Sequence, residues 1–193
     1  MTERSPTRSL ARQGRIPMLE RDQVAPEVAA MYDALLAQRG VVPNMFKTIA
    51  HIPAMAQGFA TFLKPIVGDG ALPGWYKELI AVRVCHLHDF QYGITAHSLS
   101  AQQKGASPEQ IQAVRDFERG PFTDAEKLGF RFADRLHRSA AEIDDQFYGT
   151  VQSVYNNLQI LELTAVAAAF EFFPRFVDGL RIPATPPPKR PDL

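Results

Sequence analysis

The chain has 193 residues, of which 46% are hydrophobic and 22% are charged, so its length and composition are those of one ordinary globular domain. Lys and Arg together number 21, Asp and Glu also number 21, and the formal net charge is zero. This balance argues against nucleic acid as a partner, because proteins that bind a polyanion usually carry a basic excess. The single cysteine, Cys85, excludes an internal disulfide and a Cys-X-X-Cys redox pair.

Signals for a membrane or for export are weak. The N-terminal stretch has no apolar core, which argues against a secretory signal. The most apolar stretch, Leu163 to Phe173, is about half as long as a membrane span and is bounded by Glu162 and Glu171. It indicates a buried helix, and we expect a cytoplasmic protein with no membrane contact.

The first half of the chain predicts three helices. Residues 1–14 are polar and carry no period, so we expect a flexible N-terminal arm there. Pro26 suits a first helical position, and an apolar pattern of helical period follows it until Gly40, which suits a stop. A second helix is expected from Pro53. A third runs from about Gly74 to the region of the single cysteine.

The second half predicts further helices. A short one is expected from Ile94 to Lys104. Ser107 and Thr123 each begin a capping box, in which a Gln or Glu three residues later reaches back to the helix start. Apolar positions from Phe147 to Tyr155 mark another helix. The longest runs from Leu158 to Phe173, and the proline that follows should end or kink it.

These elements predict an all-α fold. No β pattern of convincing length and no hairpin signal is found. We therefore expect a bundle of about seven or eight helices over residues 15–183, followed by a proline-rich tail over residues 184–193 that cannot be helical.

Glu78 and His97 are the candidate catalytic residues. Each lies among apolar residues of a predicted helix. A carboxylate and an imidazole in such surroundings can form a hydrogen-bonded pair, in which the carboxylate fixes the tautomer of the ring and the pair serves as a proton relay. The alternative is two surface residues on separate helix faces.

His86, His88 and Asp89 suggest a metal site, but the spacing argues against one. Two histidines at i and i+2 on a helix point about 200° apart and cannot share an ion. A strand or loop would allow it, whereas polar residues at a helix end, suited to the helix dipole, are the simpler interpretation. We therefore predict no metal site and no cofactor.

Cys85 lies seven residues after Glu78, on the same face of a continuous helix. A nearby carboxylate raises the pKa of a thiol and weakens it as a nucleophile, so we expect a buried cysteine that serves as a small hydrophobic residue. Neither a glycine-rich phosphate loop nor a G-x-S-x-G nucleophile elbow is present, which leaves nucleotide and serine-hydrolase chemistry without support.

Three stretches together resemble the carboxymuconolactone decarboxylase family, which includes the AhpD-like alkylhydroperoxidases. They are RIPML with VVPNMFKTIAHIPAMAQGF, then LPGWYKELIAVRVCHLHDFQYGITAHSLSAQQKGAS, and finally LQILELTAVAAAFEFFPRFVDGLRIP. The resemblance implies the all-α AhpD-like fold and a homo-oligomer, often a trimer or hexamer, with a pocket near subunit contacts. The phenylalanine-rich last helix is compatible with self-association.

The resemblance also carries over to single residues. Glu78 matches the acidic residue of the family and His97 its histidine, with the expected spacing of 19. The two cysteines of the peroxidase members would stand seven and four residues before that histidine, where this chain has Phe90 and Gly93. Of the Glu-Tyr-Glu-Trp found in decarboxylase-like members, the chain keeps only Tyr92.

Three functions compete at this point. The first is a cofactor-free lyase or isomerase acting on a small carboxylate or lactone, with His97 as proton donor or base and Glu78 orienting it. Tyr92 is then a possible second donor, and Arg83 a candidate for holding a substrate carboxylate. The second is an AhpD-type antioxidant enzyme, against which the missing thiol pair argues. The third is a catalytically silent oligomeric scaffold that binds a small molecule.

Overall fold

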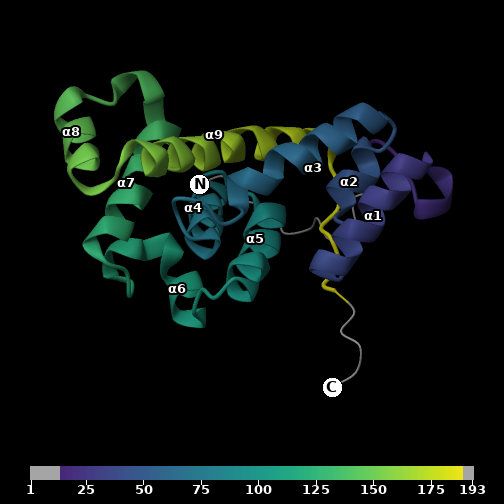
Figure 1. The fold of residues 1–193 in the computed structure, drawn as a ribbon, viewed down its shortest axis with the longest axis horizontal. Helices are drawn as coiled ribbons and strands as arrows, with labels where there is room; N and C mark the ends of the chain where they lie inside the picture. The colour runs from purple at the N-terminus through teal and green to yellow at the C-terminus, as the bar shows by residue number, and fades with distance from the viewer. Residues whose placement is uncertain (1–13, 189–193) are drawn as a thin grey trace, which may run out of the picture.

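The computed structural model describes residues 14–188 and is all-helical over that range (Figure 1). It contains no strand in these residues, which confirms the predicted all-α class, and nine α-helices, more than the seven or eight expected. The helices are α1 (Pro26–Arg39), α2 (Asn44–Ile49), α3 (Pro53–Val67), α4 (Gly74–Leu87), α5 (Gln91–Gln103), α6 (Pro108–Ala113), α7 (Asp124–Ser139), α8 (Asp145–Val154) and α9 (Asn157–Leu180).

Most helix ends follow from local sequence chemistry. Ser107 and Thr123 accept hydrogen bonds from the backbone N–H groups three residues on, as their capping boxes predict. Asn156 caps α9 in the same way. Gly40 ends α1 in the left-handed conformation, with φ of 70°, which glycine adopts without steric strain.

Helix α4 forms the centre of the molecule. It packs against α5, α7 and α9, so all of its sides are covered and its residues from Leu79 to Val82 are entirely buried. The buried Lys77 lies on the same helix; its ammonium group donates to the carbonyl oxygen of Pro65 at 3.1 Å and pairs with Glu162 of α9 at 3.2 Å. A central helix of this kind can hold a charged side chain only when neighbouring helices supply its partners.

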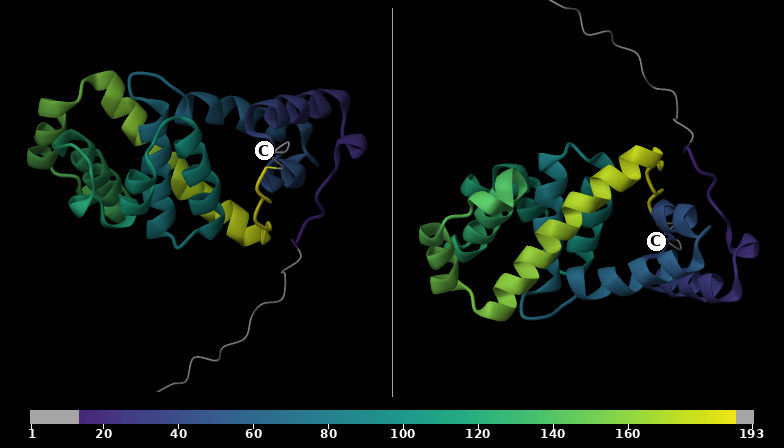
Figure 2. Two further views of the ribbon diagram at one scale, coloured as in Figure 1. Left: turned by 90° about the horizontal axis from the view of Figure 1, so that it is seen from below. Right: turned by 90° about the horizontal axis from the view of Figure 1, so that it is seen from above.

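Helix α9 runs from α8 to the C-terminal segment, and α1 with the residues before it lies beyond that end (Figure 2). It does not end at Phe173 as the sequence predicts, but continues through Pro174 to Leu180. Proline removes one backbone donor from the helix interior. Pro174 is buried, as are Phe173 and Val177, so packing against the core holds the helix together beyond the proline.

Short α2 was not predicted, because its six residues are too few for a clear helical period. It lies beside the C-terminal segment, which the sequence assigns to a separate tail. The amide of Asn44 donates to the carbonyl oxygens of Pro183 and Ala184, and Thr185 accepts from the Asn44 backbone N–H. Residues 184–188 are extended and lie against the helices.

The predicted flexible arm, except for residue 14, and the last five residues of the predicted tail lie outside the described residues. No helix within residues 14–188 is long and apolar enough to cross a membrane.

Candidate functional site

Glu78 of α4 is completely buried, and hydrogen-bond donors surround its carboxylate. One oxygen, Oε2, lies 2.6 Å from Nδ1 of His97. The other, Oε1, accepts from the Ser100 hydroxyl at 2.6 Å and from the Lys104 ammonium group at 2.5 Å. Burial raises the pKa of this carboxyl, but His97 and Lys104 lower it more, and the pKa of Glu78 falls to about 2. Glu78 is therefore ionised at neutral pH.

His97 of α5 presents its other ring nitrogen to a cavity. Because the ionised Glu78 accepts from Nδ1, the neutral ring carries its proton on Nδ1 and a lone pair on Nε2. Within residues 14–188, Nε2 has no hydrogen-bond partner. No side-chain nitrogen or oxygen in this range is both buried and unpaired, so Nε2 is accessible from the cavity that His97 lines. The ring of Phe170 stands edge-on to the imidazole, with centroids 4.5 Å apart, and restricts its rotation.

Two adjoining cavities lie beside this pair. The inner one has a volume of about 50 Å³, and its walls are apolar apart from His97, Tyr92 and Arg39. The outer one has a volume of about 340 Å³ and lies between α5 and the C-terminal segment, residues 184–188. Arg39 and Tyr92 line both cavities, so a ligand in the outer cavity lies next to the inner one. This combined size fits a small organic molecule.

Tyr92 stands on the wall between the two cavities. Its hydroxyl oxygen accepts from the Met45 backbone N–H at 3.2 Å and shares a hydrogen bond of 2.9 Å with the hydroxyl of Thr185. Burial raises the pKa of Tyr92 more than these hydrogen bonds lower it. The hydroxyl therefore keeps its proton at neutral pH, and it joins α5 to the C-terminal segment.

Arg83 lies away from Glu78 and His97. Its guanidinium group forms a two-pronged ion pair with Asp134 of α7, at 2.6 and 2.8 Å, and lies over the ring of Phe117. It lines neither of the two cavities. The arginine that does so is Arg39, at the end of α1, for which no ion pair is formed within residues 14–188.

Solved structures with the same fold are known. A peroxidase-related protein of Ralstonia eutropha JMP134, described as an alkylhydroperoxidase AhpD core, matches with a TM-score of 0.82 and 18% identity over 89% of this chain and 92% of that one. A peroxidase-related protein of Silicibacter sp. TM1040 matches at 0.80 and 20%, over 94% of both chains. The debrominase Bmp8, as a cysteine-to-alanine variant in complex with 2,3,4-tribromopyrrole, matches at 0.78 and 20%, over 88% of this chain and 90% of that one. At these identities the likeness establishes the fold alone.

A family model matches part of the chain. Residues 53–134, from the start of α3 into α7, match the model of the carboxymuconolactone decarboxylase family and contain Glu78, Tyr92 and His97. This match and the shared fold make the chain similar to carboxymuconolactone decarboxylase/AhpD-like proteins. No curated protein sequence matches it.

The protein has an apolar contact where the resemblance to the peroxidase members would place two thiols. The backbone of Gly93 lies close to both the Phe90 ring and the Cys85 sulfur. A β-carbon at Gly93 would come within 2.5 Å of that ring. Cys85 itself is 0% exposed, and burial raises the pKa of its thiol, with Glu78 adding to the effect. The prediction that Cys85 is a buried hydrophobic residue agrees with this environment.

Ser100 and Lys104 are site residues that the sequence analysis missed. They follow His97 by three and seven residues, so all three lie on one face of α5. That spacing was available in the sequence. It became informative only once Glu78 was known to be buried, because a buried carboxylate requires more than one donor.

His86 and His88, near the end of α4, have different surroundings in the structure. His86 lies at the last turn of α4, whereas His88, just after it, contacts Glu171 of α9 and His137 of α7. The sequence analysis found no carboxylate–histidine cluster here. It was wrong on this point, because the partners of His88 are distant in the chain and reach it only through the packing of α7 and α9.

Proposed function

We propose that this protein is a cofactor-free lyase or isomerase that moves a proton on a small carboxylate or lactone, with His97 as the catalytic acid and base. The observation that carries the proposal is the 2.6 Å contact between His97 Nδ1 and Glu78, which directs Nε2 into an apolar cavity. General acid–base catalysis needs such a positioned group with a free nitrogen lone pair.

The Glu78–His97 pair supplies both halves of a proton transfer. The neutral ring takes a proton from the substrate at Nε2, and the resulting imidazolium is stabilised by the carboxylate at Nδ1. In the opposite direction the imidazolium donates from Nε2. Lys104 and Ser100 hold the second oxygen of Glu78, so the carboxylate keeps its position while the ring changes charge.

Arg39 is the group that we propose binds the carboxylate of the substrate, in place of Arg83. It lines both cavities and has no acidic partner within the described chain, whereas Arg83 is already paired with Asp134. A guanidinium group binds a carboxylate through two parallel hydrogen bonds. Tyr92, which lines the inner cavity with Arg39 and His97, is proposed as a second proton donor.

In the lyase form of the reaction the carbon–carbon bond to the carboxylate breaks and carbon dioxide leaves. The electron pair of that bond stays on the substrate carbon, delocalised into a neighbouring carbonyl or lactone group, and Nε2 of the His97 imidazolium then donates a proton to that carbon. In the isomerase form His97 removes a proton from one carbon and returns it to another. Both forms need an apolar cavity that limits competing protonation by water. The bound tribromopyrrole of the debrominase with a similar fold suggests a flat, ring-sized substrate.

The environment of Cys85 disfavours an AhpD-type peroxidase function. A peroxide-reducing cysteine needs an accessible thiolate, whereas Cys85 is completely buried and burial raises its pKa. A silent binding scaffold with the same cavities is the remaining alternative, and it predicts binding without turnover.

The experiment is solvent deuterium incorporation, followed by NMR, for a panel of small unsaturated lactone acids and aromatic or heteroaromatic carboxylic acids, with carbon dioxide release measured in parallel. We expect at least one compound to exchange or lose its carboxylate. His97→Asn should lower the rate by about 100-fold or more, the usual contribution of a positioned acid or base. Arg39→Gln should mainly raise KM.

His51→Gln is the matched control, because His51 is exposed, its one hydrogen bond within the described residues is to the carbonyl oxygen of Pro17, and it lines neither cavity. Its rates should equal those of the wild type. The proposal fails if no compound of the panel reacts although some bind, which would favour the scaffold, or if His97→Asn reacts as fast as the wild type.

We also propose that the protein self-associates. Phe62 of α3 and Phe172 of α9 are 50% and 48% exposed and lie side by side with Ile66 and Ala168 in one apolar surface hollow. Apolar surface of this kind often marks a subunit contact. Light scattering should show that the wild type is larger than a monomer and that Phe172→Glu is a monomer. A monomeric wild type would contradict the proposal.

A further inference from the structure

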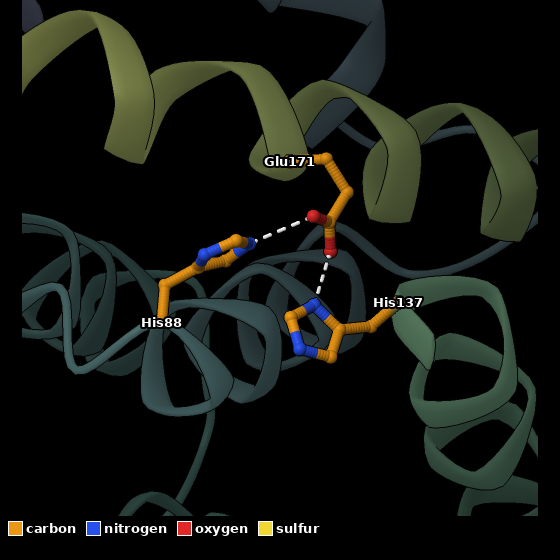
Figure 3. A group of neighbouring side chains, drawn as sticks. All are labelled: His88, His137 and Glu171. Carbon is orange, nitrogen blue, oxygen red and sulfur yellow. Dashed lines mark hydrogen bonds and ion pairs between the residues drawn. The ribbon is translucent and has the colours of Figure 1, made fainter. Parts of the chain in front are cut away.

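A second cluster of histidine and carboxylate side chains lies where three helices meet, apart from the cavities (Figure 3). His88 immediately follows α4, His137 lies in the last turn of α7, and Glu171 lies in the middle of α9. The two imidazoles point at the two carboxylate oxygens of Glu171 from different sides. The proposed proton-transfer reaction uses none of these residues.

The contacts in the cluster are short. His88 Nε2 lies 2.7 Å from Oε2 of Glu171, and His137 Nδ1 lies 2.7 Å from Oε1. The two rings stand edge to face, with centroids 4.7 Å apart. Burial raises the pKa of Glu171, but hydrogen bonds from His137 and His88 lower it more, so the carboxyl is ionised at neutral pH. The side chains are between 16% and 27% exposed, which leaves the cluster accessible from solvent.

We propose that His88, His137 and Glu171 bind a divalent transition-metal ion, with Zn²⁺ as the representative. Two imidazole nitrogens and one carboxylate oxygen are a ligand set that zinc accepts in proteins, with water in the fourth position. Imidazole also favours zinc, nickel and copper over magnesium and calcium, which prefer oxygen ligands. The chemistry of the three side chains therefore selects the class of ion.

The spacing of the ligand atoms suits the ion. One atom from each residue can be chosen so that all three lie within 4.8 Å of one another. Around a tetrahedral zinc ion, with bonds of about 2.0–2.2 Å, ligand atoms are separated by about 3.4 Å. Each nitrogen–oxygen contact of 2.7 Å must therefore lengthen by about 0.7 Å, whereas ligand separations as long as 4.8 Å must shorten by up to about 1.4 Å. Each neutral ring carries its proton on its other nitrogen when the ion binds.

Arg175 competes with the ion for Glu171. One turn further along α9, its guanidinium group contacts the backbone carbonyl oxygen of Glu171 and lies 3.3 Å from carboxylate Oε2. The side chain is 69% exposed, so it can turn into solvent when a cation enters. Removing this positive charge should strengthen the binding of the metal, which gives the proposal a test on a surface residue.

The test uses untagged full-length protein, freed of metal with a chelator and moved into chelator-free buffer. Zn²⁺ is titrated in competition with a chromophoric chelator, and the melting temperature is measured with and without the ion. We expect one Zn²⁺ per chain and a higher melting temperature, because an ion that binds only the folded state stabilises it. Mg²⁺ should produce neither effect.

Substitutions locate the ion. His137→Asn and Glu171→Gln should each weaken Zn²⁺ binding by more than about 100-fold, beyond the 10–100-fold typical of residues that only support a ligand. Arg175→Gln should strengthen it by about fivefold, the effect of one unit charge at about 4 Å when water screens it fully, as it does for this 69% exposed side chain. His86→Asn and His97→Asn are the controls, because His86 is not among the three residues whose ligand atoms converge and His97 lines the inner cavity.

Clear results would overturn the proposal. The absence of saturable Zn²⁺ binding to the wild type would do so, as would unchanged binding by both His137→Asn and Glu171→Gln. A loss of binding in His97→Asn with none in His137→Asn would place the ion in the cavity instead. Should Glu171→Gln fail to fold, the exposed Arg175→Gln variant decides, because weaker binding there would exclude Glu171 as a ligand.

Discussion

The buried carboxylate of Glu78 should make the stability of the protein depend on pH in a way that one substitution removes. Glu78→Gln keeps the size of the side chain and one oxygen acceptor but removes the charge that His97 and Lys104 contact. Lys104 keeps a second acceptor, the carbonyl oxygen of Val67 at 2.6 Å, and is partly exposed. The variant should therefore fold, with lower stability.

The magnitude follows from the pKa. The pKa of Glu78 falls from 4.5 to about 2 in the folded protein, and at about 1.4 kcal/mol per pKa unit this corresponds to about 3 kcal/mol of stability at neutral pH. Because the folded-state pKa lies below the unfolded one, this contribution is fully present above pH 4.5 and is lost as the pH falls toward 2. At pH 3, about 2 kcal/mol of it should already be lost.

The assay is urea denaturation of the wild type and Glu78→Gln at several pH values between 7 and 3. The difference in unfolding free energy should narrow from about 3 kcal/mol at pH 7 to about 1 kcal/mol at pH 3. Glu118→Gln is the control: Glu118 pairs with Arg131 on the surface, with 47% of its side chain exposed, and exposed pairs contribute at most about 1 kcal/mol.

Two results would refute this reasoning. A difference that stays constant from pH 7 to pH 3 would mean that Glu78 is not a low-pKa carboxylate in the folded state. A Glu78→Gln variant as stable as the wild type at pH 7 would mean that the buried charge and its donors contribute nothing beyond a neutral hydrogen-bonded group.

Three further predictions concern packing. Cys85 should resist alkylation by iodoacetamide in the native protein and react once urea unfolds it, because the thiol is completely buried. Mass spectrometry measures the labelling, and rapid labelling of the native protein would contradict the burial. Gly93→Ala should lower the urea-measured stability by about 1–3 kcal/mol through overpacking, whereas Gly149→Ala, where a β-carbon meets nothing within 4 Å, should leave it unchanged or higher. Asn44→Ala, which removes two hydrogen bonds to the C-terminal segment, should speed carboxypeptidase digestion of that segment; an unchanged rate would show that other contacts hold it.

The parts of the fold that could be predicted from sequence are those that depend on near neighbours in the chain. The capping boxes at Ser107 and Thr123 and the glycine stop at Gly40 act within one helical turn, and all three mark helix ends in the structure. The exception is Pro174, where the local penalty of a proline is outweighed by the burial of the residues around it.

The candidate site shows the limit of sequence reasoning more clearly. Glu78 and His97 come from adjacent helices of one motif, and the structure brings them together as expected. The position of Arg83 was not predictable in the same way, because the sequence does not show which face of α4 meets Asp134 of α7. Arg39 reaches the outer cavity because the end of α1, the C-terminal segment and α5 line it together, and long-range packing of this kind leaves no mark in local spacing.

The extended segment after α9 limits the chemistry that the outer cavity can offer to a ligand. Three consecutive prolines, Pro186 to Pro188, form part of its wall, and proline has no backbone N–H. This wall therefore presents carbonyl oxygens and ring carbons but no backbone donor at these positions. An anionic group in this cavity must then find its donors at other lining groups, such as the Arg39 guanidinium and the polar side chains of α5.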